Sequence, residues 1–151
     1  MESSLGPDSR RSSTWPAEAP VVLIVDDDEL SRLLIDATLD ELGLQNPRLH
    51  AEDGDRAVEM MRPGAAGTSA PPALVMLDGR MPGRTGLDVL HWMRDQPTLA
   101  RVPVVMLTGV SDVESIRSAY DSGAASYLVK PVAYQALADV LRGLRAPWIL
   151  L

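Results

Sequence analysis

The stretch VVLIVDDD at residues 21–28 joins an apolar run directly to three acidic residues. Residues 21–25 are apolar and mostly β-branched, and the run is bounded by Pro20 and the aspartates. A short continuous run of this kind is typical of a strand buried on both faces of a parallel sheet. The stretch therefore predicts a buried strand whose carboxyl end carries a cluster of carboxylates.

A helix is predicted directly after this strand. Asp28 is well placed to cap it, and Gly43 is a stop signal. The residues that recur at helical intervals between them are Leu30, Leu33, Leu34, Ala37, Thr38 and Leu39.

The alternation of strand and helix continues along the chain. Pro63 is expected to end the second helix, residues 64–72 to form a loop, and Gly123 to stop the fourth helix. Further strands are predicted at 48–51, 73–77, 102–107 and 126–129, and further helices at 56–61, 86–94, 112–122 and 132–144. Five strands alternating with five helices indicate right-handed βαβ units, and hence a doubly wound α/β fold with a parallel sheet covered on both faces.

Length and composition narrow the class of protein. The 151 residues indicate one domain at about 150 residues per domain. A net charge of −7 argues against nucleic-acid binding. The absence of cysteine excludes disulfides and thiolate chemistry and fits a cytoplasmic location. Apolar runs of about five residues predict no membrane span, and the N-terminus lacks the apolar core of a secretory signal.

The chain is expected to divide into three parts. Residues 1–20 are rich in Ser, Pro and charge and predict a disordered arm. The folded domain is expected at 21–146, followed by an apolar tail at 147–151.

Chemically capable side chains follow four of the predicted strands. In an open parallel sheet, functional groups gather beyond the carboxyl ends of the strands. The residues at these positions are Asp26, Asp27 and Asp28 after the first strand, Asp78 after the third, Thr108 after the fourth and Lys130 after the fifth. Any one of them alone is better explained as a cap or a turn residue, but the ordered set predicts a site.

The chemistry of this set favours phosphoryl transfer. Clustered carboxylates repel one another unless a cation neutralises them, and Mg²⁺ prefers carboxylate, water and phosphate oxygens. One carboxylate can then act as the nucleophile toward a phosphoryl group and form an aspartyl phosphate. Lys130 supplies a second positive centre, and the hydroxyl of Thr108 can donate a hydrogen bond to a phosphoryl oxygen. No P-loop motif is present, and a metal site built from His50 and His91 is not expected.

Four segments resemble the signature stretches of bacterial response-regulator receiver domains, the CheY-like family: VVLIVDDDELSR, ALVMLDGRMPGRTGLDVL, VPVVMLTG and ASYLVKPV. The resemblance covers about residues 20–146 and implies a flavodoxin-like three-layer fold with strand order 2-1-3-4-5. The site it implies has Asp78 as the phosphoacceptor, Mg²⁺ held by Asp26, Asp27, Asp78 and the backbone carbonyl of Arg80, phosphate contacts from Thr108 and Lys130, and Tyr127 as the aromatic that changes rotamer on activation.

The resemblance also implies how such a chain acts. It would accept phosphate from a sensor histidine kinase and signal through the face formed by the fourth helix, fifth strand and fifth helix, assisting its own phosphorylation and dephosphorylation without being an enzyme in the usual sense. The segments RVPVVMLT and SAYDSGAASYLVKPV, with Trp148 after the last helix, resemble stand-alone regulators that serve bacterial phytochromes. A generic stand-alone receiver is the alternative.

Two rival functions remain open at this point. One rival is a degenerate receiver that acts only as a protein-binding scaffold, although the presence of all the acceptor-site residues argues against it. Gly79 and the MPGRTG segment depart from the usual family pattern, but neither departure touches a reacting group. A phosphatase of the haloacid-dehalogenase type is the other, but it requires an acid two residues after the nucleophile, where this chain has Arg80. Arg80 and Val110 are expected to border the path of the attacking water and to slow the loss of phosphate.

The last helix and tail carry more apolar surface than one sheet face needs. This surface predicts a homodimer through the fourth helix, fifth strand, fifth helix and tail, with a tail folded back on its own domain as the alternative. The candidate interface residues are Tyr120, Tyr134, Val140, Leu144 and Trp148.

Overall fold

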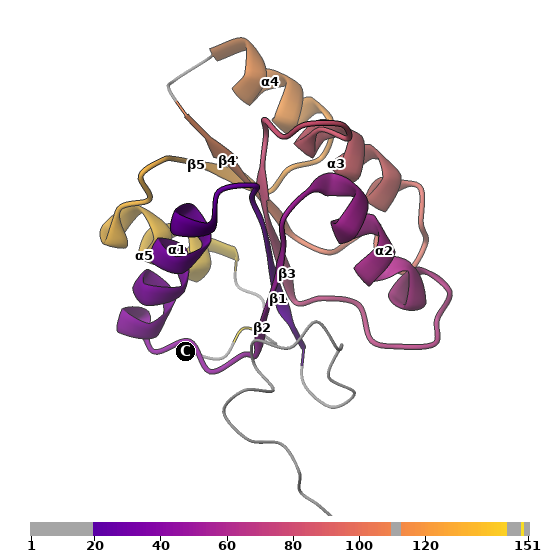
Figure 1. The fold of residues 1–151 in the computed structure, drawn as a ribbon, viewed down its shortest axis with the longest axis horizontal. Coiled ribbons are helices and arrows are strands. Elements are labelled where there is room, and N and C mark those ends of the chain that lie inside the picture. Colours follow the sequence, from indigo (N-terminus) through magenta and orange to yellow (C-terminus); the bar gives the residue numbers. More distant parts are fainter. Residues whose placement is uncertain (1–19, 110–112, 145–148, 150–151) are drawn as a thin grey trace, which may run out of the picture.

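The computed structural model describes residues 20–109, 113–144 and 149. Within them, five strands alternate with five helices (Figure 1). The elements are β1 (Val22–Val25), α1 (Glu29–Leu42), β2 (Arg48–Ala51), α2 (Gly54–Ala65), β3 (Leu74–Asp78), α3 (Gly86–Arg94), β4 (Val104–Thr108), α4 (Val113–Asp121), β5 (Ser126–Val129) and α5 (Tyr134–Leu144). The strands form one parallel sheet in the order β2-β1-β3-β4-β5, which confirms the predicted fold class.

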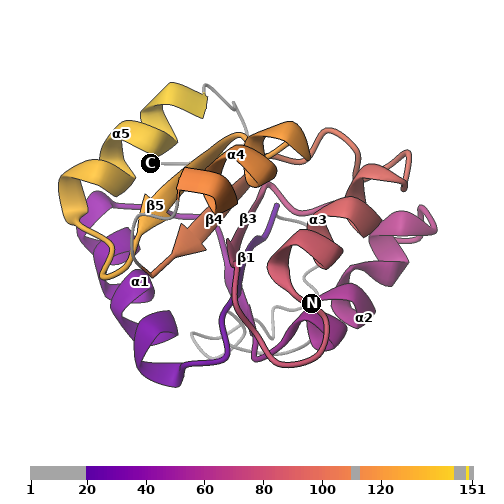
Figure 2. The same ribbon diagram turned by 90° about the horizontal axis from the view of Figure 1, so that it is seen from above.

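The sheet is the middle of three layers. Helices α1 and α5 lie on one face and α2 and α3 on the other (Figures 1 and 2). Alternate residues of each strand point into two separate apolar cores, with Val22 and Ile24 facing α1 and α5, and Leu23 and Val25 facing α2 and α3. The central strands β1 and β3 are buried along their whole length, as their continuous apolar runs predict.

Helix α1 begins and ends where its sequence signals indicate. Asp28 caps the first turn by accepting a hydrogen bond from the backbone N–H of Leu30, and Gly43 ends the helix with a φ of +83°. The helix packs on the sheet through Ile35 and Leu39. Three of the residues that predict the helix lie on its outer side instead. Leu30, Leu33 and Leu34 are each more than half exposed.

Helix α2 is longer than its sequence suggests. It begins at Gly54 rather than Arg56, capped by Asp53, and it passes through Pro63 to end at Ala65. The prediction that Pro63 ends the helix is therefore wrong. The proline lies in the last turn, and its own carbonyl still accepts hydrogen bonds from the backbone N–H groups of Thr68 and Ser69, so the turn remains satisfied.

Other boundaries shift by small amounts. β3 and β4 each extend to include the polar residue at their end, Asp78 and Thr108. β4 begins at Val104 and α5 at Tyr134, each two residues after the predicted start. The expected start of the fourth helix at Asp112, the arm before Pro20, and the tail residues other than Ile149 lie outside the described residues. None of the helices in the described ranges is long and apolar enough to cross a membrane.

Candidate functional site

Strand register brings the polar strand ends together at one edge of the sheet. Val25 of β1 pairs with Leu77 of β3, so the next residues, Asp26 and Asp78, are neighbours across the sheet. Thr108 is paired with Val129 in the same way, and its carbonyl accepts a hydrogen bond of 2.6 Å from the backbone N–H of Lys130. The carboxyl ends of four strands thus converge as the sequence predicts.

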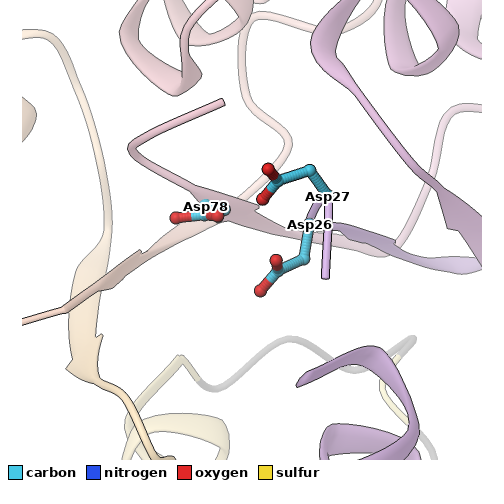
Figure 3. A group of neighbouring side chains, drawn as sticks. All are labelled: Asp26, Asp27 and Asp78. Carbon is cyan, nitrogen blue, oxygen red and sulfur yellow. The ribbon is translucent and has the colours of Figure 1, made fainter. Parts of the chain in front are cut away.

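Three carboxylates form a compact cluster at this edge. One carboxylate oxygen from each of Asp26, Asp27 and Asp78 lies within 4.8 Å of the other two (Figure 3). Asp26 is fully buried and Asp78 is 4% exposed, whereas Asp27 is exposed. The cluster is therefore open to solvent on the side of Asp27 and closed beneath Asp26.

Asp26 is held by contacts to all three of its oxygen atoms. Oδ1 accepts a hydrogen bond from the backbone N–H of Asp28 at 2.9 Å, and Oδ2 accepts one from Nζ of Lys130 at 3.0 Å. Its backbone carbonyl accepts a hydrogen bond from the guanidinium of Arg32, one turn into α1. A buried carboxylate needs such partners, because an unpaired charge in the interior is costly.

Lys130 is the cation of the site. Its Nζ lies 3.0 Å from Oδ2 of Asp26 and 3.3 Å from Oδ2 of Asp78. Burial lowers the pKa of Lys130, but hydrogen bonding and attraction to the two carboxylates outweigh it and raise the pKa overall. The ammonium is therefore fully charged at neutral pH. The peptide bond from Lys130 to Pro131 is cis.

Asp78 is the carboxylate whose protonation is most altered by the fold. Burial raises its pKa, and so does the charge of Asp26. The backbone N–H of Arg80, which donates to Oδ1 at 3.2 Å, and the nearby Lys130 both lower it. The net effect raises the pKa of Asp78 from 3.8 to about 6. A carboxylate tuned in this way is a typical feature of functional sites.

The hydroxyl of Thr108, at the end of the strand next to β3, has no partner in the part of the chain that the structure describes. Its Oγ1 is buried and has no hydrogen-bond partner among the described residues. A buried hydroxyl without a partner is free to donate a hydrogen bond to a group that enters the site. Tyr127 of β5 is partly buried in the core, and its ring packs edge-on against Tyr120 of α4 at a centroid distance of 6.0 Å.

The donor set fits a hard divalent cation. Carboxylate oxygens from Asp26, Asp27 and Asp78 converge with one side exposed, and Mg²⁺ prefers a few carboxylates with water and phosphate oxygens completing its coordination. Charge supports the same assignment, because Lys130 is the one residue in the described ranges that forms an ion pair with any of the three clustered acids. Asp28, the fourth acid, instead caps α1.

The structure adds contacts that sequence reasoning missed. Arg32 supports Asp26 from α1, and Gly86 packs against the acceptor strand so closely that a Cβ there would lie 2.4 Å from the carbonyl oxygen of Asp78. The glycine is visible in the MPGRTG segment, but only the packing shows why a side chain is excluded. No pattern in the sequence singles out Arg32.

The predicted interface residues fall into two groups. Tyr120 and Tyr134 are 46% and 44% exposed, on α4 and α5, and Val129 between them on β5 is 42% exposed. Val140 and Leu144 are partly buried against the core beneath α1 and α5, and Ile149 of the tail packs against the same core. Trp148, like Val110, lies outside the described residues.

The site therefore combines a doubly wound parallel sheet with three clustered carboxylates and a lysine at its carboxyl edge. The sequence matches the response regulator receiver domain over residues 22–142. The chain therefore belongs to the response-regulator receiver family of two-component systems. It is 34% identical over 118 residues to the chemotaxis protein CheY of Pseudomonas aeruginosa, which covers 78% of this chain and 90% of that protein.

Solved structures give the same result. The bacteriophytochrome response regulator AtBRR matches with a TM-score of 0.76 and 28% identity, over 89% of this chain and 98% of its own. A second one, RtBRR, matches with a TM-score of 0.78 and 29% identity, over 88% of this chain and 82% of its own. The Mn²⁺-bound form of response regulator Rcp1 matches with a TM-score of 0.68 and 26% identity, over 85% of this chain and 99% of its own.

Proposed function

We propose that this receiver accepts a phosphoryl group on Asp78 from a phosphohistidine of a sensor histidine kinase. The observation that carries the proposal is the placement of Asp78, a buried carboxylate at the end of β3, with Nζ of Lys130 at 3.3 Å and two further carboxylates beside it. In the reaction an oxygen of Asp78 bonds to phosphorus. The bond from phosphorus to the histidine nitrogen breaks, and the imidazole keeps the electron pair.

The residues around Asp78 have separate roles in this reaction. Lys130 pairs with the carboxylate before transfer and with the phosphoryl oxygens after it. Thr108 donates its unpaired hydroxyl to a phosphoryl oxygen. This new contact draws Thr108 toward the acceptor and opens space for Tyr127 to change rotamer, which carries the change to the surface of α4, β5 and α5.

Asp26, Asp27 and Asp78 would hold Mg²⁺, with the backbone carbonyl of Arg80 as the further ligand that the family resemblance implies. When bound, the cation neutralises the acids and stabilises negative charge on the phosphoryl oxygens. The Mn²⁺-bound relative Rcp1 supports a divalent cation in a fold of this type. The chain's own contribution is to keep Asp26 buried and fixed while Asp27 stays accessible.

The partners follow from the same relationships. The similarity to AtBRR and RtBRR supports a bacteriophytochrome as the phosphodonor kinase. The exposed side chains Tyr120, Val129 and Tyr134 support the α4–β5–α5 face as the output and dimer surface. We place these exchanges in the cytoplasm, in keeping with a chain that has no cysteine.

Mass spectrometry after incubation with acetyl phosphate and Mg²⁺ tests the proposal. The full chain should gain one phosphoryl group, and Asp78→Asn should gain none because an amide cannot form the acyl phosphate. Asp28→Asn is a matched control, since asparagine caps a helix as well as aspartate and the variant keeps Asp78. It should label normally. Failure of the full chain to label would favour the scaffold function, and turnover of a phosphate ester would favour a phosphatase.

A further inference from the structure

The loop that follows Asp78, residues 79–85, is closed on itself and anchored in the core. The backbone N–H of Gly86 donates to the carbonyl of Gly79 at 3.4 Å, which joins the two ends of the loop. Met81, in its middle, is 7% exposed and packs in the core between the sheet and α2 and α3. The loop therefore has little freedom at its ends or its centre.

The first residue of α2 presses against the far end of this loop. A Cβ on Gly54 would lie 2.5 Å from the carbonyl oxygen of Arg84 and 3.1 Å from a methyl group of Val89. The nearest atom is backbone, which cannot rotate away as a flexible side chain can. Only a glycine allows the start of α2 and residues 79–85, the acceptor loop, to approach this closely.

A charged contact joins the same two segments. Nε of Arg84 lies 3.1 Å from Oδ1 of Asp55, the residue after Gly54. Asp55 is exposed, so the ion pair alone is weak, but it adds a lateral restraint to the close backbone packing.

The start of α2 is itself firmly held. Asp53 caps the helix by accepting a hydrogen bond from the backbone N–H of Arg56 at 2.7 Å. The strand before it is tied to the acid cluster, because the backbone N–H of Asp26 donates to the carbonyl of Ala51 at 3.1 Å. A short rigid path thus connects Asp26, through the β2–α2 turn, to the acceptor loop.

We infer that the start of α2 positions the acceptor loop. Gly54 allows the two backbones to pack closely, and the Asp55–Arg84 ion pair restrains them from the side. By holding residues 79–85, these contacts would position the backbone carbonyl of Arg80 for the cation. The inference rests on the proposed metal site and extends it, because it assigns part of the Mg²⁺ affinity to residues that never touch the cation. Outer contacts that orient metal ligands commonly change affinity by about 10- to 100-fold.

Calorimetric titration of the full chain with Mg²⁺ tests the role of Gly54. Gly54→Ala should weaken binding by about tenfold or more. Gly64→Ala is the matched control in the same helix, since its Cβ would meet its nearest neighbours at an ordinary 3.5–3.7 Å. It should bind Mg²⁺ like the parent. Labelling by acetyl phosphate should be slow in Gly54→Ala at low Mg²⁺ and recover at saturating Mg²⁺, which a general loss of folding would not produce.

The contribution of the Asp55–Arg84 ion pair can be tested without disturbing the backbone. Removing the positive charge of Arg84 would strengthen Mg²⁺ binding if charge alone mattered, whereas losing a restraint would weaken it. We expect Arg84→Gln and Asp55→Asn each to weaken binding by about two- to fivefold, in line with an exposed ion pair, and Arg84→Lys to restore most of it.

The outcomes separate this inference from the proposed function. A parent chain that binds no Mg²⁺ overturns both. A parent that binds Mg²⁺, with Gly54→Ala equal to it, overturns the inference alone. If Gly54→Ala fails to fold, the charge variants decide, and tighter binding by Arg84→Gln refutes the positioning role.

Discussion

Nζ of Lys130 lies 3.3 Å from Oδ2 of Asp78, which joins the end of β5 to the end of β3 across the strand between them. The same nitrogen is 3.0 Å from the fully buried Asp26. One ammonium group thus balances two carboxylates that the fold forces together. The site before phosphorylation is held by this shared cation, and its stability should depend on it.

Removing Lys130 should destabilise the protein when no metal is bound. Lys130→Met leaves Asp26 buried without its cation, and we expect a loss of about 2–3 kcal/mol in the free energy of unfolding at pH 7 in the presence of EDTA. Mg²⁺ should restore part of this loss, because it supplies the missing positive charge. Urea unfolding with and without Mg²⁺ measures both effects. Equal stability of parent and variant in EDTA would contradict the pairing.

The raised pKa of Asp78 gives stability a defined dependence on pH. Burial, and then the charge of Asp26, keep the pKa near 6, against 3.8 for an ordinary aspartate. Between about pH 4 and 6 the folded protein therefore holds a proton that the unfolded chain has released. By linkage, the contribution of Asp78 to stability is greatest below this window and is lost as the pH rises through it.

The variant Asp78→Asn isolates this contribution, because an amide does not titrate. Measured in EDTA, the free energy of unfolding of Asp78→Asn relative to the parent should rise between pH 4 and 7, by an amount on the order of 1–2 kcal/mol. Denaturant titrations at several pH values provide the measurement. A difference that stays constant with pH would show that Asp78 titrates normally in the fold.

Asp27 should matter for the cation more than for the fold. It is the exposed member of the cluster, and Asp27→Ala removes a carboxylate ligand and its charge, so Mg²⁺ affinity measured by calorimetry should fall by at least about tenfold. The metal-free variant should be no less stable than the parent, because repulsion within the cluster is reduced. Asp28→Asn also removes one negative charge next to the cluster, but Asp28 caps α1, so this variant should keep most of the Mg²⁺ affinity. Unchanged affinity in Asp27→Ala would exclude it as a ligand.

Much of the site follows from the sequence because parallel strands in register bring their ends together. Asp26 and Asp78 each follow an apolar run, and the pairing of Val25 with Leu77 converts that shared position into proximity. The contacts of Arg32 and Gly54 do not follow, because they depend on how α1 and α2 sit on the sheet. A linear pattern carries no information about the distance between two segments that meet only after packing.

Periodicity predicts a helix more reliably than it predicts which side is buried. Leu33 and Leu39 both belong to the apolar pattern of α1, yet one is 51% exposed and the other fully buried. The buried side also includes Asp36, whose carboxylate lies close to the side chains of Arg48 and His50 of β2. A buried charged residue of this kind is stable only because its partners come from another element, which the spacing within one helix does not reveal.

Two leucines of α1 give a direct test of this packing. Leu39→Ala should lower the free energy of unfolding by about 2–4 kcal/mol, since it opens a cavity in the core beneath α1 and α5. Leu33→Ala, the same substitution on the same helix, should change it by less than about 0.5 kcal/mol. Thermal or urea unfolding of the two variants checks both values. Comparable losses would mean that the outer side of α1 is covered by another part of the chain.

The α4–β5–α5 face should govern self-association, and the tail should not. Val129 and Tyr134 are exposed on this face, whereas Val140, Leu144 and Ile149 pack on the domain's own core. Large apolar side chains grouped on a surface commonly mark an interaction site, and a symmetric pair of such faces closes a dimer.

We therefore expect sedimentation of the phosphorylated chain at tens of micromolar to show a dimer. The combined change Val129→Thr and Tyr134→Ser should convert this dimer to monomer. Leu33→Ser, which changes an exposed apolar residue on α1 instead, is the control and should leave the dimer intact. Deletion of residues 147–151 should lower thermal stability through the loss of Ile149 while the dimer persists. Dissociation on deletion of the tail alone, with no effect of the two face substitutions, would assign the interface to the tail instead.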